Sequence, residues 1–172
     1  IKVYWFISDA FAKINSIWKR LMIGGGALGV LIFFIPPLYG EGYKTIIALL
    51  NGKEADIFVG SPAHQYADNI YMVLIFLTVM MFVKVIATSF TFGAGGIGGV
   101  FAPTLFMGSA AGYIFSKTIN TFSLGDLSVT NFSLVGMCGM IAGVLHAPLT
   151  AIFLIAEITS GYELFLPLMV TG

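Results

Sequence analysis

Residues 70–103 read IYMVLIFLTVMMFVKVIATSFTFGAGGIGGVFAP, and this stretch decides the fold. It begins with an apolar run from Ile70 to Phe92 that one charge, Lys84, interrupts. A membrane-spanning helix needs about 20 mostly apolar residues, so the run predicts a transmembrane helix. A glycine-rich segment then leads to Pro103, and a new apolar helix is expected from about Thr104 to Ile119. Irregular backbone at membrane depth survives only inside protein or beside a cavity, which favours a transporter over a simple anchor.

The composition agrees with a membrane protein. Of the 172 residues, 58% are hydrophobic and 9% are charged, whereas soluble domains carry about 25% charged residues. So few charges cannot cover a water-facing surface, so the expected surroundings are a lipid bilayer. Eight basic and eight acidic residues balance to zero, which gives no electrostatic reason to expect a nucleic-acid partner. Cys138 is the single cysteine, so no intrachain disulfide is possible.

Two helices are expected before residue 36. Apolar residues recur at three- and four-residue steps from Tyr4 to Leu21, which predicts a helix leaving the membrane, with Trp5 and Trp18 at interfaces and Asp9 paired to Lys13. A second span is expected from Leu21 to Ile35, where Pro36-Pro37 ends it. Its Gly25 and Gly29 have the spacing that allows close helix packing.

Short, interrupted segments make up the rest of the chain. A turn at Gly40-Glu41-Gly42, a short helix from Tyr43 to Leu50 and an aqueous loop from Lys53 to Asn69 precede the main span. After it, Phe132–Leu145, Leu149–Ile158 and Leu164–Val170 are apolar runs separated by His146-Ala147-Pro148 and by Gly161. The prediction is an all-α polytopic membrane protein with tilted and broken helices, of which residues 1–172 are a fragment.

The glycine run allows three interpretations. Gly93 to Gly98 matches the GxGxxG dinucleotide pattern, but a long span precedes it and no acidic residue follows at the required distance. A second interpretation is an anion cradle, because glycines let successive N–H groups face one point and a helix N-terminus carries partial positive charge. The third is a tight turn between packed helices. The residues alone leave the last two open.

Two motifs add a family resemblance. Gly98-Gly99-Val100-Phe101-Ala102-Pro103 resembles the Gly-x-Phe-x-Pro signature of CLC-type voltage-gated chloride channels and chloride/proton antiporters. Farther on, Ala147-Pro148-Leu149-Thr150 with Glu157-Ile158-Thr159 is similar to another stretch of that family. The resemblance implies that residues 1–172 are the second half of a CLC-like membrane domain.

The resemblance also implies a chloride site. In the family, backbone N–H groups of the x and Phe positions bind chloride, which implies Val100 and Phe101 here, with Gly99 beside them. The family's other donors are a serine in a Gly-Ser-Gly-x-Pro motif and a tyrosine on a later helix, and its gating glutamate lies in a Gly-Lys/Arg-Glu-Gly-Pro motif. None of these motifs occurs in this sequence.

Other polar residues carry weaker hypotheses. Lys84 within a span could add positive potential for anions. Alternatively, its side chain could snorkel to the membrane interface or pair with a carbonyl group. Glu157 is expected to be structural at a helix end. His64 and His146 lack metal-binding spacing, so neither a metal nor another cofactor is expected.

The expected function is transport of chloride or a similar small anion, as a channel or as a chloride/proton antiporter, with no enzymatic activity. The alternatives are a membrane-embedded scaffold and an intramembrane enzyme, although convergent catalytic residues are absent from the sequence pattern. The resemblance further implies a homodimer, with Leu149, Ile152, Phe153 and the run from Leu164 to Val170 facing the partner.

Overall fold

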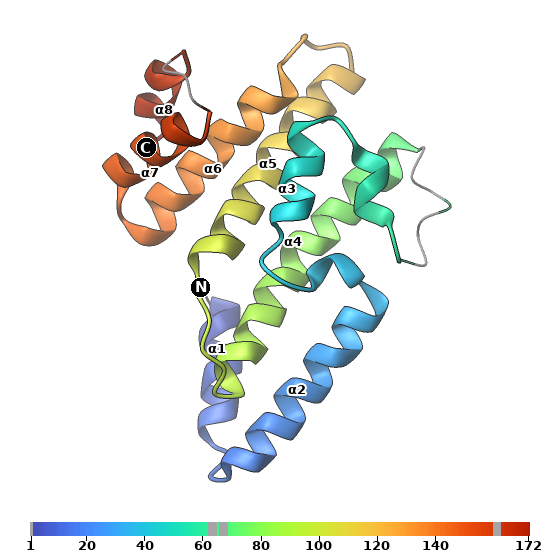
Figure 1. Ribbon diagram of the computed structural model, residues 1–172, viewed down its shortest axis with the longest axis vertical. Coiled ribbons are helices and arrows are strands. Elements are labelled where there is room, and N and C mark those ends of the chain that lie inside the picture. The colour runs from blue at the N-terminus through green and yellow to red at the C-terminus, as the bar shows by residue number, and fades with distance from the viewer. Residues whose placement is uncertain (1, 62–64, 66–68, 160–162) are drawn as a thin grey trace. The chain divides into compact units, whose positions relative to one another are not determined.

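The computed structural model describes residues 2–61, 65, 69–159 and 163–172 (Figure 1). Within them every regular element is a helix, which confirms the all-α prediction. The helices in chain order are α1 (Lys2–Ala12), α2 (Ile17–Phe34), α3 (Tyr43–Leu50), α4 (Ile70–Gly93), α5 (Phe101–Thr121), α6 (Val129–Leu145), α7 (Pro148–Ile158) and α8 (Phe165–Thr171), with 3-10 turns η1 (Pro36–Leu38) and η2 (Glu54–Phe58). They form two compact units, one of residues 1–42 and 58–103 and the other of residues 43–57 and 104–172.

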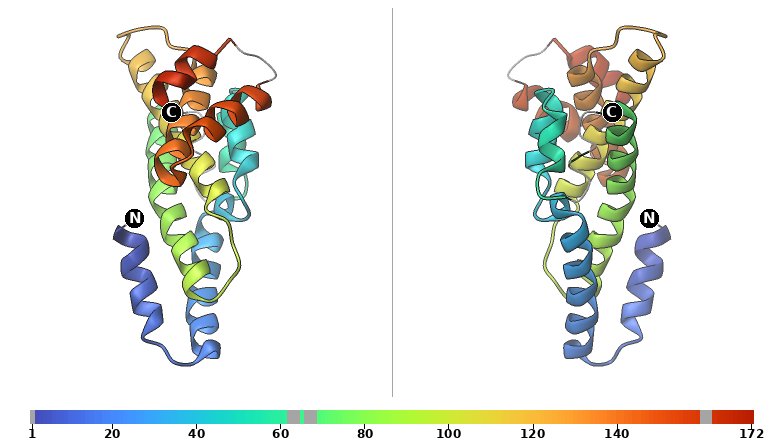
Figure 2. Two further views of the ribbon diagram at one scale, coloured as in Figure 1. Left: turned by 90° about the vertical axis from the view of Figure 1, so that its left-hand side faces the viewer. Right: turned by 90° about the vertical axis from the view of Figure 1, so that its right-hand side faces the viewer.

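The first unit is built on α4. Both α1 and α2 pack against α4 (Figures 1 and 2). Phe11 of α1 is buried and meets the ring of Phe90 edge-on, with centroids 5.9 Å apart. A Cβ placed on Gly24 of α2 would lie 2.6 Å from the Cβ of Ala94, so the start of α2 adjoins the end of α4. The two long helices therefore run antiparallel.

Three expectations for this part of the chain need correction. The helix expected from Tyr4 to Leu21 is two helices, because it breaks at residues 13–16, where Asn15 and Ser16 favour local turns over helix. The Asp9–Lys13 pair does not form in the described part of the chain. Gly25 and Gly29 meet nothing within 4 Å of an added Cβ.

The segment expected to be an aqueous loop contains a buried piece. Ile57 and Phe58 are 2% and 1% exposed, and the ring of Phe58 stacks on Phe76 of α4 at 4.6 Å. The prediction of a fully aqueous loop over residues 53–69 was therefore wrong for η2. Its Pro62 and His64 lie outside the described residues.

The second unit is built on α6. Helices α3, α7 and α8 pack against it, and α5 approaches it so closely that a Cβ on Gly108 would lie 2.5 Å from the Gly136 carbonyl oxygen. The chain turns from α6 to α7 at His146, which adopts the left-handed conformation with φ 53°, and Pro148 occupies the first position of α7. The predicted interruption at residues 146–148 is thus confirmed.

Candidate functional site

The first glycines of the run between α4 and α5 end a helix. Gly95 has φ +91°, and its N–H donates to the Phe92 carbonyl at 3.0 Å, while the Gly96 N–H donates to the Thr91 carbonyl at 2.9 Å. These two bonds with a left-handed glycine form a Schellman motif, which satisfies the last carbonyl groups of α4. Gly95 and Gly96 therefore have a structural role.

Close packing explains why Gly93 is a glycine and gives a second reason for Gly96. A Cβ on Gly93 would lie 2.7 Å from the Phe11 ring, and one on Gly96 would lie 2.9 Å from the Thr91 carbonyl oxygen. Real Cβ atoms do not approach their neighbours so closely, so neither position accepts a side chain without a shift. The interpretation as a packing turn holds for residues 93–96.

The second half of the run leads into a helix N-terminus. Gly98, Gly99 and Val100 are exposed, and α5 begins at Phe101. The first turn of α5 contains no acidic residue, and Pro103 within it has no N–H to leave unpaired. Within the described residues, the Phe101 N–H has no hydrogen-bond acceptor. Such an end offers the free N–H group of Phe101 and partial positive charge, which suits an anion.

Gly99 has an unstrained backbone conformation. The left-handed residue of this run is Gly95, and Gly99 has no positive φ. An added Cβ on Gly99 would meet nothing within 4 Å. A side chain at Gly99 is therefore compatible with the backbone of this chain.

Lys84 pairs with carbonyl groups. Its side chain is 4% exposed, and Nζ donates to the Leu38 carbonyl at 3.1 Å and to the Gly40 carbonyl at 2.8 Å. The carboxylate of Glu41, on the same turn, attracts the positive charge of Lys84. The charge in the middle of α4 thus holds the turn that follows α2, as the carbonyl hypothesis predicts.

The remaining polar candidates lie at helix ends. Glu157 is exposed in the last turn of α7, and the N–H of the capping Thr159 donates to the carbonyls of Ile155 and Glu157. His146 is exposed at the C-terminus of α6. Among the described residues no three His, Cys, Asp or Glu side chains gather as metal ligands would.

Comparison with known proteins decides the family. The model of the family described as voltage gated chloride channel matches residues 1–172. The chain belongs to the voltage-gated chloride channel family. Proteins of this family are integral membrane proteins, and α2 and α4 are the two described helices long and apolar enough to cross a membrane.

Bacterial members of the chloride channel family align with nearly the whole chain. It is 33% identical over 179 residues to the H(+)/Cl(-) exchange transporter ClcA of Vibrio vulnificus, covering 99% of this chain and 34% of the relative. The ClcA of Vibrio campbellii is 34% identical with the same coverage. A ClcB-like protein of Ralstonia nicotianae is 34% identical over 151 residues, or 87% of this chain and 31% of the relative. The chain thus spans about a third of the length of these relatives.

Sequence reasoning missed several residues that determine the structure of the glycine run, of α2 and around Lys84. It did not separate the Schellman glycines from Gly98 and Gly99, although a glycine two residues after an apolar helix is a recognisable capping signal. It selected Gly25 and Gly29 rather than Gly24 as the close-packed glycine of α2. Nothing in the sequence identified Leu38 and Gly40 as the partners of Lys84, because these contacts are not local.

Proposed function

We propose that this chain is part of a protein that transports chloride or a similar small anion across a membrane and has no enzymatic activity. The family match over residues 1–172 and the names of the Vibrio relatives support this function. Because the relatives are about three times longer, we further propose that residues 1–172 are one part, the second half, of a longer membrane domain. Donors contributed by other parts of that protein would complete the site.

The proposed anion ligands in this chain are the backbone N–H groups of Val100 and Phe101. Gly99 directly precedes them and completes the proposed site. The observation that carries this proposal is the start of α5 at Phe101, with an unpaired N–H and no acidic residue in its first turn. Backbone donors hold an anion without a full positive charge that would trap it. A transport site needs binding that is favourable and also readily reversed.

An ester in place of the Phe101 amide tests the site directly. The change removes one N–H donor and leaves the side chain in place. A hydrogen bond to a charged group contributes about 1.5–3 kcal/mol, so chloride affinity should fall about ten- to hundredfold. Isothermal titration of the full-length protein with chloride measures the effect.

The matched control is the same ester at Ile97, which is fully exposed four residues earlier in the same segment. It should leave chloride affinity unchanged. Equal affinity of the Phe101 ester and the unmodified protein, with the fold intact, would exclude Phe101 as a donor. Residues 98–100 would then be a connection between helices and nothing more.

A second measurement, of proton movement that accompanies chloride flux, distinguishes exchange from channel activity. The Vibrio relatives are named as H(+)/Cl(-) exchange transporters, which favours exchange, whereas the family description names a channel. In liposomes that contain the full-length protein and start without a proton gradient, a chloride gradient should drive proton movement across the membrane. Chloride flux without proton movement would indicate a channel, and absence of halide flux would favour the scaffold or enzyme alternatives.

A further inference from the structure

The turn between α1 and α2 concentrates positive charge. Residues 13–20 read KINSIWKR, with three basic residues and no acidic one. Asp9, the nearest acidic residue in the sequence, lies on α1 and forms no ion pair with Lys13 in the described part of the chain. Lys13 and Lys19 are both exposed. Two exposed ammonium groups therefore have no counter-ion among the residues that the structure describes.

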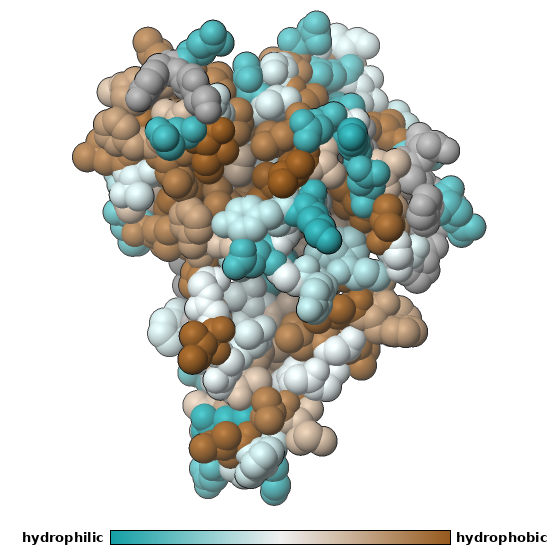
Figure 3. All heavy atoms as spheres, in the orientation of Figure 1, coloured by the Kyte–Doolittle hydropathy of each residue, from teal (hydrophilic) through white to brown (hydrophobic). Residues whose placement is uncertain are grey.

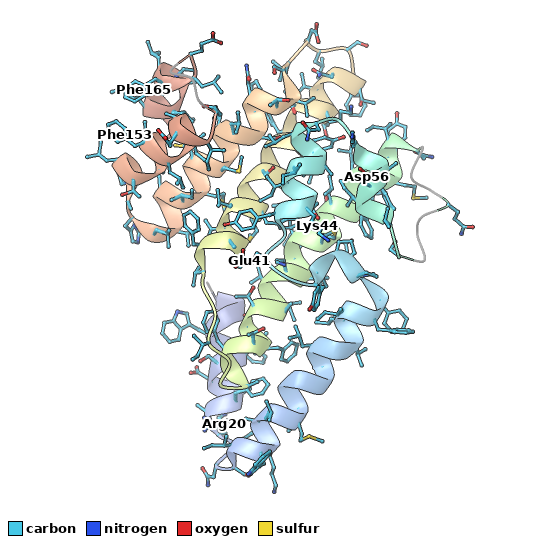
Figure 4. All side chains as sticks on the ribbon, viewed as in Figure 1. Arg20, Glu41, Lys44, Asp56, Phe153 and Phe165 are labelled. Atoms are coloured by element: carbon cyan, nitrogen blue, oxygen red, sulfur yellow. The ribbon has the colours of Figure 1, made fainter. Side chains whose placement is uncertain are left out.

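Arg20 fixes the shape of this turn. Its Nε donates to the Ile14 carbonyl at 2.6 Å and its Nη2 donates to the Ala12 carbonyl at 3.2 Å. Figure 4 labels Arg20 at the start of α2 beside the turn. The guanidinium thus satisfies carbonyl groups at the end of α1 and joins the two helices. Lys13 and Lys19 are presented from a connection that is already ordered, which lowers the entropy lost on binding.

Apolar groups accompany the charges. Ile17 and Trp18 in the first turn of α2 are each 77% exposed. They begin a helix apolar enough to cross a membrane and largely uncovered by protein in this chain. Figure 3 shows hydrophilic and hydrophobic surface side by side at the bottom of the view, where Figure 1 draws this turn. Tryptophan prefers the headgroup level of a bilayer, so the turn has the composition of a membrane interface.

The charges at the two ends of α2 differ. Residues 13–20, which comprise the connection before α2 and its first turn, carry three basic and no acidic residues. Residues 35–69, between α2 and α4, carry two basic (Lys44, Lys53) and four acidic ones (Glu41, Glu54, Asp56, Asp68). Basic residues beside a span favour the cytoplasmic side. That surface displays anionic lipids, which attract nearby lysine and arginine residues.

We propose that Lys13 and Lys19, with Trp18 between them, form a binding site for an anionic phospholipid headgroup. The ammonium groups bind the phosphate, Trp18 lies against the glycerol and upper acyl region, and Arg20 holds the turn. The ligand is a lipid and not a free phosphate, because the exposed Ile17 and Trp18 need acyl chains to cover them.

Native mass spectrometry of the full-length protein in detergent tests this site. The probes are phosphatidylglycerol and phosphatidylcholine with identical acyl chains. The unchanged protein should prefer phosphatidylglycerol, and K13Q/K19Q should bind it about thirtyfold more weakly, as expected for two lost lysines near an anionic lipid surface. K19Q alone should lower the affinity about fivefold.

The control variant K44Q/K53Q removes two exposed lysines elsewhere in the chain and should keep the preference. Glycerol phosphate, which has the charge without acyl chains, should not displace the lipid. Equal binding of the two lipids, unchanged binding by K13Q/K19Q, equal losses in both double variants, or displacement by glycerol phosphate would each overturn the proposal. Unchanged chloride flux in K13Q/K19Q would separate this site from the anion pathway.

Discussion

At the scale of single residues, Lys84 shows how a charge is accommodated inside an apolar helix. Its ammonium group donates to the carbonyls of Leu38 and Gly40, 46 and 44 residues earlier in the chain. Replacing it by methionine, Lys84→Met, leaves both carbonyls without this donor. Bonds to charged groups contribute about 1.5–3 kcal/mol, so we expect the full-length protein to lose stability of that order. Thermal unfolding in detergent measures the change.

Two variants distinguish the loss of these two hydrogen bonds, here called the Lys84 clamp, from a general effect of removing a charge. Lys84→Arg keeps a cation and several donors, so it should recover much of the lost stability. Lys53→Met removes an exposed lysine and should leave the melting temperature unchanged. The clamp would be refuted if Lys84→Met melted like the unchanged protein.

At the scale of helices, glycines set the distance between α5 and α6. A Cβ on Gly112 would overlap the Phe132 carbonyl oxygen, and a Cβ on Gly108 or Gly136 would also clash with the backbone of the other residue. Backbone atoms cannot rotate away, so Gly112→Ala must push the helices apart. Overpacking costs about 1–3 kcal/mol, which exceeds the gain of roughly 1 kcal/mol in helix propensity. The variant should therefore lower the midpoint of thermal unfolding.

Gly29→Ala is the matched control for the helix pair, because an added Cβ there meets nothing within 4 Å. It makes the same chemical change within a helix and should be neutral or stabilising by up to about 1 kcal/mol. If Gly112→Ala and Gly29→Ala behaved alike, close approach would not limit the packing of α5 on α6.

At the scale of the whole molecule, the open question is association through α7 and α8. Leu149, Phe153, Leu166, Met169 and Val170 are exposed apolar residues on these helices, and the rings of Phe153 and Phe165 lie 5.9 Å apart (Figure 4). Apolar surfaces in lipid associate through close shape complementarity. In the proposed homodimer, single cysteines at exposed positions such as Phe153 and Val170 should crosslink between subunits.

The structure narrows the positions that the sequence predicted for this contact. Ile152 and Leu168 are 6% and 0% exposed within the chain, so cysteines there should stay unlinked and serve as controls. The native Cys138 is also buried and should give little background. Absence of intersubunit product at every exposed position would contradict dimerisation through α7 and α8.

The sequence alone determined the elements whose causes are local. The apolar run from Ile70 to Phe92 predicted α4, Tyr43–Leu50 predicted α3 with the same bounds, and Pro36 and Pro148 marked a helix end and a helix start. Run length, helix breakers and the Gly-x-Phe-x-Pro motif are properties of neighbouring residues, so they are visible without a structure. The same locality let the motif predict a helix N-terminus next to Val100 and Phe101.

The tertiary structure decided what depends on distant partners. Periodicity could not tell which glycine of α2 would meet α4, because Gly24, Gly25 and Gly26 are equivalent until one helix face is covered. It could not show that η2 is buried, or that Lys84 bonds to a turn more than 40 residues away. Such contacts depend on how separate helices pack, and burial and hydrogen-bond pairing follow from that packing and not from local propensity.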